Sequence, residues 1–324
     1  MIDIGSTYTK VAAVDIRGEC ITDTARAFTT ARTDINEGLE NALAELRQRT
    51  GTKSYSGRFA CSSAAGGLRM VAVGLVPSLT AEAAKMASLS AGAKVLKTYS
   101  YELNDRETEE IYSLRPDIIL LSCGTDGGSR NTVLHNARKI AAIDGDFPVV
   151  AACNKAALDE VLEILAGGGK DARPCENVMP EFNVLNIAPA QNLIRQIFLE
   201  RIIRAKGLTK VRELVEGILM PTPAAVLKAA GLLSEGTGAE KGLGGLLIAD
   251  VGGATTDVYS VTDGNPEMSG AILKGIPEPF EKRTVEGDLG VRYNAASLAE
   301  AAGIAEVAAR AGVTLEEASR LVEM

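Results

Sequence analysis

The sequence predicts an α/β protein of at least two domains, one of which contains a doubly wound parallel sheet. Three observations lead to this fold class. The chain has 324 residues, more than a single hydrophobic core usually serves. Two segments far apart, 2–10 and 249–257, share a pattern of an Asp, a Gly-rich turn and hydroxyl side chains. Between them, from about residue 68, apolar strand-like runs alternate with helix-like segments, as in parallel sheets covered on both faces.

The first element is a β-hairpin that turns shortly after Asp3. Apolar residues lead into this Asp, and the turn and following strand carry small, hydroxyl and basic residues, namely Gly5, Ser6, Thr7, Thr9 and Lys10. Backbone N–H groups of such a turn can form a nest for phosphate, and Gly allows a close approach. The alternative is an ordinary hairpin in which Gly5 serves only the turn. Lys10 either neutralises phosphate charge or is a solvated strand residue.

A strand, a helix and a further strand complete this first segment. Residues 21–29 have the composition of a strand, and Asp34 followed by Glu37 is typical of a capping box at a helix start. Gly51 ends this helix, and a strand follows over 58–62. We assign residues 1–67 and 183–240 to one lobe that is interrupted by an insert.

The insert covers residues 68–182 and contains five βα units. Such a series suits a flavodoxin-like sheet, whose crevice lies beyond the carboxyl ends of its first and third strands. In this chain the loops 75–80 and 124–129 stand at those places. The second loop is therefore a candidate ligand or docking loop, with the residues Gly124, Thr125, Asp126, Gly127 and Gly128.

The second lobe, residues 241–324, opens with a hairpin that repeats the first one. Its candidate residues are Asp250, Gly252, Gly253, Thr255, Thr256 and Asp257. The recurrence favours phosphate contact over an ordinary turn at both hairpins. Two such turns facing each other would hold the β- and γ-phosphates of ATP, or the phosphates of ADP, while Asp3 and Asp250, the catalytic pair, position Mg²⁺ through water. Asp257 either joins the metal shell or ends the hairpin.

The composition excludes some classes of binding partner and indicates the cellular compartment of the protein. The formal net charge of −8 argues against nucleic acid or an anionic membrane as a partner. No apolar run approaches the roughly 18 residues that cross a bilayer, so we expect a soluble cytoplasmic protein. Five scattered Cys residues and a single His, His135, disfavour a zinc site and indicate reduced thiols. Cys123 and Cys153 are interpreted as small buried hydrophobic residues rather than cluster ligands.

The order of these parts resembles the acetate and sugar kinase, heat-shock chaperone and actin superfamily. The segment 220–230, Met-Pro-Thr-Pro-Ala-Ala-Val-Leu-Lys-Ala-Ala, is similar to the connecting helix that precedes the second phosphate loop of the chaperones. The segment 250–257, Asp-Val-Gly-Gly-Ala-Thr-Thr-Asp, is similar to that loop. The resemblance implies a duplicated ribonuclease-H-like fold whose two lobes close on ATP and Mg²⁺.

A closer resemblance covers almost the whole chain. Segments 3–10, 124–128, 217–225 and 284–292 together resemble the GlmL family. These are accessory proteins of glutamate mutase and similar adenosylcobalamin-dependent mutases, distinct from the mismatch-repair proteins also called MutL. The resemblance implies an ATP-dependent reactivase or chaperone with weak ATPase activity, whose partners are the mutase subunits. A homodimer is left open.

Cobalamin itself is not expected in the insert. Cobalamin-binding domains share the architecture of this insert but supply a His from the loop after the first strand. The corresponding loop 74–77 has no His. We therefore expect partner docking or another small ligand at the 124–128 loop.

The chain departs from the superfamily pattern in two ways that keep other functions open. The adenosine-binding Gly pair normally follows the second hairpin at a distance, but the helical segment 298–324 stands there instead, so we expect a truncated second lobe. Met220 occupies the place of a chaperone Glu that organises water and metal. One alternative is a nucleotide-binding scaffold without hydrolysis. Another is a metabolite kinase on the same fold, although no clear catalytic carboxylate or acceptor pocket is visible near the first turn.

Overall fold

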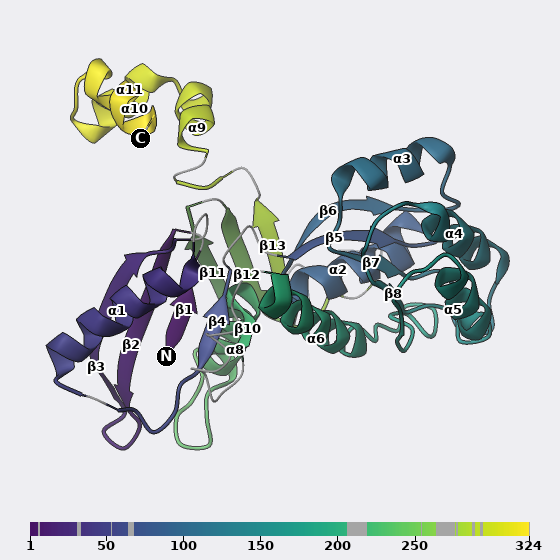
Figure 1. Ribbon diagram of the computed structural model, residues 1–324, viewed down its shortest axis with the longest axis horizontal. Helices are drawn as coiled ribbons and strands as arrows, with labels where there is room; N and C mark the ends of the chain where they lie inside the picture. The colour runs from purple at the N-terminus through teal and green to yellow at the C-terminus, as the bar shows by residue number, and fades with distance from the viewer. Residues whose placement is uncertain are drawn as a thin grey trace, which may run out of the picture.

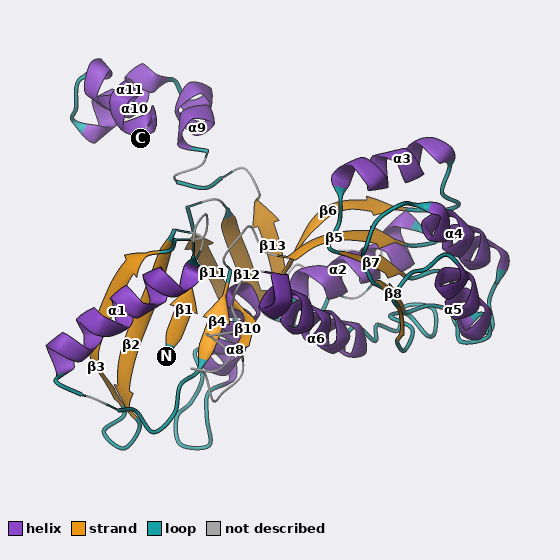
Figure 2. Cartoon of the chain, viewed as in Figure 1, coloured by secondary structure: helices purple, strands orange, loops and turns teal. Residues whose placement is uncertain are grey.

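The described part of the chain folds around three sheets (Figure 1). The computed structural model describes residues 1–5, 7–30, 34–52, 54–63, 68–205, 219–253, 255–263, 276, 278–286, 289–291 and 294–323. Helices pack against the sheets, so the chain is an α/β protein, as the sequence predicted (Figure 2).

The first sheet contains the hairpin around Asp3. Its strands are β1 (Ile2–Ile4), β2 (Tyr8–Asp15), β3 (Cys20–Phe28), β4 (Ala60–Ser62) and β10 (Leu219–Pro221), in the order β10-β4-β1-β2-β3. β4 runs parallel to β1 and β10, whereas β2 is antiparallel to β1 and β3. Helix α1 (Ile35–Thr50) covers the face that carries the buried Ile4 and Val11. Asp3 and Lys10, which pair across β1 and β2, lie on the opposite face.

Helix α1 begins and ends at the residues that the sequence indicated. Asp34 caps it, although its side chain accepts from the backbone N–H of Asn36, at 2.9 Å, rather than from Glu37. Gly51 ends the helix in the left-handed conformation, with φ of 66°, where Gly avoids the strain of a side chain. Local signals therefore placed this helix correctly.

The second sheet is parallel throughout. Its strands are β5 (Leu68–Val73), β6 (Ala93–Tyr99), β7 (Ile118–Leu121), β8 (Val149–Ala151) and β9 (Ala172–Pro174), in the order β6-β5-β7-β8-β9. Numbered from β5, this is the flavodoxin-like order 2-1-3-4-5 predicted for the insert. The connections carry a π-helical turn η1 (Pro77–Ala81) and the helices α2 (Glu82–Ser90), α3 (Asp105–Leu114), α4 (Asn131–Ala142) and α5 (Leu158–Gly167).

Separate cores cover the two faces of this parallel sheet. Leu121 packs in one core with Val133 of α4 and Val161 of α5. Leu120 points the other way and shares a core with Phe198 of α6 (Ala188–Ala205). Helix α6, which the sequence assigned to the first lobe, therefore also covers one face of the insert.

The polar and sulfur-bearing residues of the insert serve its packing. Cys123 and Cys153 are each 1% exposed and are free thiols, in agreement with their interpretation as small hydrophobic residues. His135 is half-buried, and its Nε2 lies 2.9 Å from Leu103 O. It therefore braces the loop before α3.

The third sheet contains the second hairpin. β11 (Leu246–Val251), β12 (Thr256–Val261) and β13 (Glu281–Glu286) form an antiparallel meander. Helix α8 (Thr222–Glu235) follows β10 directly and contacts both β4 and β12, so it links the first sheet to the third. The predicted helical end consists of α9 (Ala295–Ala302), α10 (Ile304–Ala311) and α11 (Leu315–Glu323), which pack on one another apart from the sheets (Figure 1).

A buried arginine joins the third sheet to the insert. Arg283 of β13 donates from Nε and Nη2 to Asp257 Oδ1, at 2.9 and 2.6 Å. From Nη1 it donates to Leu89 O in α2 and to Ala93 O at the start of β6, at 2.9 and 3.0 Å. Arg283 is 5% exposed and Asp257 7%. One side chain thus holds the second hairpin against the amino edge of the parallel sheet.

Replacing Arg283 by Met is expected to destabilise the protein by about 3–5 kcal/mol, because Asp257 is left buried without its counter-ion. Urea unfolding followed by circular dichroism measures this loss. Lys282→Met is the matched control, since it removes a partly exposed ion pair with Glu278 and should cost less than about 1 kcal/mol. Equal losses for the two variants would contradict the role of Arg283.

Candidate functional site

The first turn is closed by a hydrogen bond that requires a glycine. The backbone N–H of Gly5 donates to Tyr8 O at 3.0 Å. A Cβ on Gly5 would lie 2.8 Å from this oxygen, too close for any other residue without a shift. Thr7 Oγ1 beside the turn is buried and has no hydrogen-bond partner in the described part of the chain. Ser6 lies outside the described residues.

The second turn has the same geometry. The backbone N–H of Gly252 donates to Thr255 O at 2.9 Å, and a Cβ there would lie 3.1 Å from that oxygen. In both hairpins the Gly stands two positions after the Asp, and the accepting carbonyl stands three positions after the Gly. The turn is therefore built twice in one chain.

The strand pairing repeats as well. Asp3 lies opposite Lys10 in the first hairpin, and Asp250 lies opposite Asp257 in the second. Both partners stand seven positions after their Asp. The two hairpins are thus equivalent in register, and they differ in the charge of the residue opposite the Asp.

Residues of both hairpins approach the start of α8. Thr222, the first residue of this helix, donates from Oγ1 to Asp3 Oδ1 at 2.8 Å. It also lines a cavity of about 170 Å³ together with residues of the second turn, namely Asp250, Gly252, Gly253, Thr255 and Asp257. Asp3 and Lys10 line a larger, mostly apolar hollow of about 770 Å³ on the open face of the first sheet. Thr222 therefore lies between Asp3 of the first hairpin and the cavity beside the second turn.

Charge also connects the two turns. The pKa of Asp250 is raised, first by burial and then by the negative charge of Asp257. Asp3 of the first hairpin adds to this rise, and Lys10 and Arg283 oppose it. Lys10 Nζ lies 3.9 Å from Asp3 Oδ2. Carboxylates from two sheets thus repel one another, and a cation between them would relieve this repulsion.

The donor set suits a hydrated hard cation. In the described ranges, no three His, Cys, Asp or Glu side chains gather as a metal cage. Asp3 and Asp250 offer carboxylate oxygens, and Mg²⁺ typically takes one or two of these beside water and phosphate. Cys61 donates to Asp3 Oδ1 at 3.5 Å, and burial with the Asp3 charge raises its pKa to about 12. The Cys61 thiol therefore stays protonated, unlike a thiolate ligand.

Three residues that the sequence predicted to contact phosphate or metal bond other parts of the protein instead. Thr9 is fully buried on the face that α1 covers, with its Oγ1 2.9 Å from Thr29 Oγ1. Thr256 donates to Leu289 O at 2.6 Å. Asp257 lines the cavity, but Arg283 binds its Oδ1. The structure thus brings neither threonine to the cleft and gives Asp257 an ion-pair partner.

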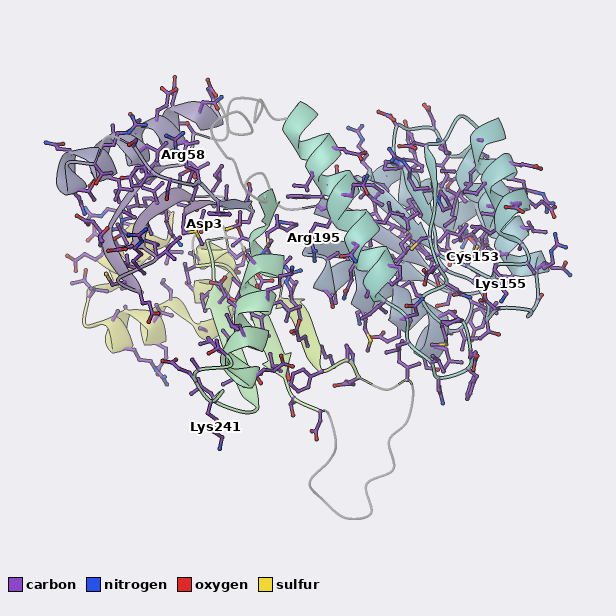
Figure 3. All side chains as sticks on the ribbon, turned by 90° about the horizontal axis from the view of Figure 1, so that it is seen from below. Asp3, Arg58, Cys153, Lys155, Arg195 and Lys241 are labelled. Atoms are coloured by element: carbon purple, nitrogen blue, oxygen red, sulfur yellow. The ribbon has the colours of Figure 1, made fainter. Side chains whose placement is uncertain are left out.

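The Gly124–Gly128 loop of the insert is braced from within. Asp126 Oδ1 accepts from the backbone N–H of Lys155 at 2.9 Å, and the Asn154 side chain bonds a loop amide and a loop carbonyl, at 3.1 and 2.8 Å. The loop follows β7 at the carboxyl edge of the parallel sheet, as predicted. Figure 3 shows Lys155 at the outer end of the insert, far from Asp3. The structure does not bring this loop to the cleft.

Sequence reasoning missed the residues that join separate elements. Thr222 belongs to the segment 220–230 that resembles a connecting helix, and a hydroxyl between a strand and a helix could have drawn attention to it. Nothing in the spacing indicates that Arg283 pairs with Asp257. Gly92 and Lys94 of the insert also line the 170 Å³ cavity, and no local pattern indicates this.

Comparison with known proteins shows relatives along the whole chain. A family model described as MutL protein matches residues 1–323. A curated protein from Clostridium tetanomorphum, named Protein MutL, is 53% identical over 305 residues. This match covers 94% of the present chain and 66% of the relative, so the chain spans just under two thirds of the relative's length. None of the described helices combines the length and apolar character that a bilayer crossing requires.

Replacing Asp250 by Asn is expected to stabilise the metal-free protein slightly at neutral pH. The folded-state pKa of Asp250 lies above its ordinary 3.8, so ionisation costs folding free energy, and this cost disappears where both states are protonated. The gain should stay below about 1 kcal/mol, because water screens an exposed edge strand. It should fade as the pH falls through the raised pKa. Thermal unfolding at a series of pH values measures it, and a gain that grows in acid would contradict the charge repulsion.

Proposed function

Because this chain belongs to the MutL family, we propose that it is an ATP-binding accessory protein of an adenosylcobalamin-dependent mutase such as glutamate mutase. The observation that supports the proposal is the pair of equivalent hairpin turns on two sheets. Thr222 bonds Asp3 of the first hairpin and lines a cavity together with residues of the second turn. The mutase is proposed from the resemblance of segments 3–10, 124–128, 217–225 and 284–292 to the GlmL accessory proteins. The protein would use nucleotide-driven movement to release damaged cofactor from that enzyme or to remodel the enzyme.

The two turns would hold the nucleotide from both sides. Backbone N–H groups near Gly5 and Gly252 would donate to the β- and γ-phosphate oxygens, since such turns form anion nests. The orphaned Thr7 hydroxyl would add a donor. Asp3 and Asp250 would hold Mg²⁺ through water, and the metal would neutralise phosphate charge. Little covalent chemistry is asked of the protein, because phosphoryl transfer depends mainly on positioning and charge.

The arrangement of the sheets would connect the bound nucleotide to the mutase. The first turn belongs to the first sheet, and the second turn belongs to the third sheet, which Arg283 fastens to the insert. A nucleotide that draws the turns together would therefore pull on the insert through the third sheet. The Gly124–Gly128 loop, with Gly127 and Gly128 exposed at the outer end of the insert, would dock the mutase.

Met220 favours a second version of the proposed function, in which the protein binds and exchanges nucleotide without useful hydrolysis. It lies on β10 opposite Cys61 of β4 and lines the hollow beside Asp3. A thioether is only a weak hydrogen-bond acceptor and cannot act as a general base. Binding and release of nucleotide would then drive the movement.

Adding the protein with MgATP to a mutase that carries inactivated cofactor is expected to restore mutase activity. A non-hydrolysable ATP analogue in place of ATP separates the two versions, since recovery with the analogue requires binding without hydrolysis. No recovery by protein that binds nucleotide would reject the accessory role.

Asp250→Asn is expected to weaken MgADP binding about tenfold or more, as loss of a metal-orienting outer-shell group does. Calorimetric titration measures the affinity. Asp159→Asn is the matched control, because Asp159 is exposed on α5 of the insert and the variant makes the same change of charge. If both variants bound MgADP like the original protein, the metal role of Asp250 would be excluded.

A further inference from the structure

One wall of the cleft beside the second turn comes from the insert. The connection from α2 into β6 supplies Gly92 and Lys94, which line the 170 Å³ cavity together with Asp250 and Gly252. These residues lie at the amino edge of the parallel sheet, since Ala93 is the first residue of β6. The insert therefore takes part in the cleft through the edge opposite to its Gly124–Gly128 loop.

Close packing fixes the position of this wall. Gly92 has a φ of +92°, and a Cβ at this position would lie 2.6 Å from Pro221 Cβ. Only Gly allows this approach of the insert to the strand that precedes Thr222. On the other side, Arg283 binds Leu89 O and Ala93 O. The segment 89–94 is thus held between the first sheet and the third.

Lys94 is the cation that this wall brings to the cleft. It is half-buried, and within the described ranges no carboxylate forms a salt bridge with it. By contrast, Lys97 on the same strand pairs with Glu110. A partly desolvated ammonium without a carboxylate partner interacts favourably with a bound anion.

We propose that Lys94 is an anion-binding residue of this cleft, whose ammonium contacts a phosphate of the nucleotide held by the second turn. This inference rests on the proposed nucleotide function and adds a contact from the insert. A phosphate bound there bridges the second hairpin and the α2–β6 connection, so the insert itself senses whether the cleft is filled.

Calorimetric titration with MgADP tests the contact. Lys94→Gln should bind MgADP about tenfold more weakly, as expected for loss of a charge-assisted contact, and Lys94→Arg should recover most of the affinity. Lys97→Gln is the matched control and should bind like the original protein. Equal unfolding temperatures would show that each variant is folded.

The outcomes separate this inference from the proposed function. If the original protein binds MgADP and Lys94→Gln binds equally well, the role of Lys94 is overturned and nucleotide binding stands. If the original protein binds no nucleotide, both fall. A loss of affinity in Lys97→Gln as large as in Lys94→Gln would show a general effect of charge and would also overturn the assignment.

Hydrogen exchange provides a readout within the insert. MgADP should slow exchange of the backbone amides of residues 89–94 in the original protein and in Lys97→Gln. At MgADP concentrations that saturate Lys94→Gln, its amides should be protected less. No change in this segment of the original protein on nucleotide binding would overturn the contact.

Discussion

The guanidinium of Arg283 joins the insert to the second hairpin. Removing Arg283 and Asp257 from water costs several kcal/mol per ion, and the four hydrogen bonds that Arg283 makes offset this cost. Two of the acceptors are backbone carbonyls, in the last turn of α2 and at the start of β6. The interaction therefore constrains both the distance and the orientation of the segment 89–94 relative to β13. This segment contains Lys94 and forms the cavity wall.

The paired hairpins depend on a second constraint, which concerns the backbone alone. In each turn a glycine N–H bonds the carbonyl three residues later, and a side chain at that glycine would meet the carbonyl oxygen. Because the turn is built twice, on separate sheets, a ligand between the turns would meet similar backbone donors from two directions. The residues opposite each Asp differ, and this breaks the symmetry. Lys10 stays near Asp3, whereas Asp257 is committed to Arg283.

Local features of this protein could be read from its sequence, and its long-range contacts could not. The parallel order of the insert, the Asp34 cap and the Gly51 stop follow from apolar periodicity and short-range hydrogen bonding, which act within a few residues. The hydroxyl of Thr222 on Asp3 joins residues 219 positions apart, a relation that no local pattern encodes. Thr9 shows the converse error, because a hydroxyl next to a phosphate-type turn can equally face the core when strand alternation turns it inward.

The insert carries the segment 89–94 at the amino edge of its sheet and the Gly124–Gly128 loop at the carboxyl edge. This arrangement has a mechanical consequence. The two longest strands, β5 and β6, have six and seven residues, so the sheet measures about 20 Å along these strands. Packed interiors transmit strain rather than absorb it. The sheet would therefore move as one rigid body about residues 89–94, where it is held between the first and third sheets. A tilt of the sheet too small to break the hydrogen bonds of Arg283 to Leu89 and Ala93 would still move the Gly124–Gly128 loop by a distance comparable to an atomic diameter.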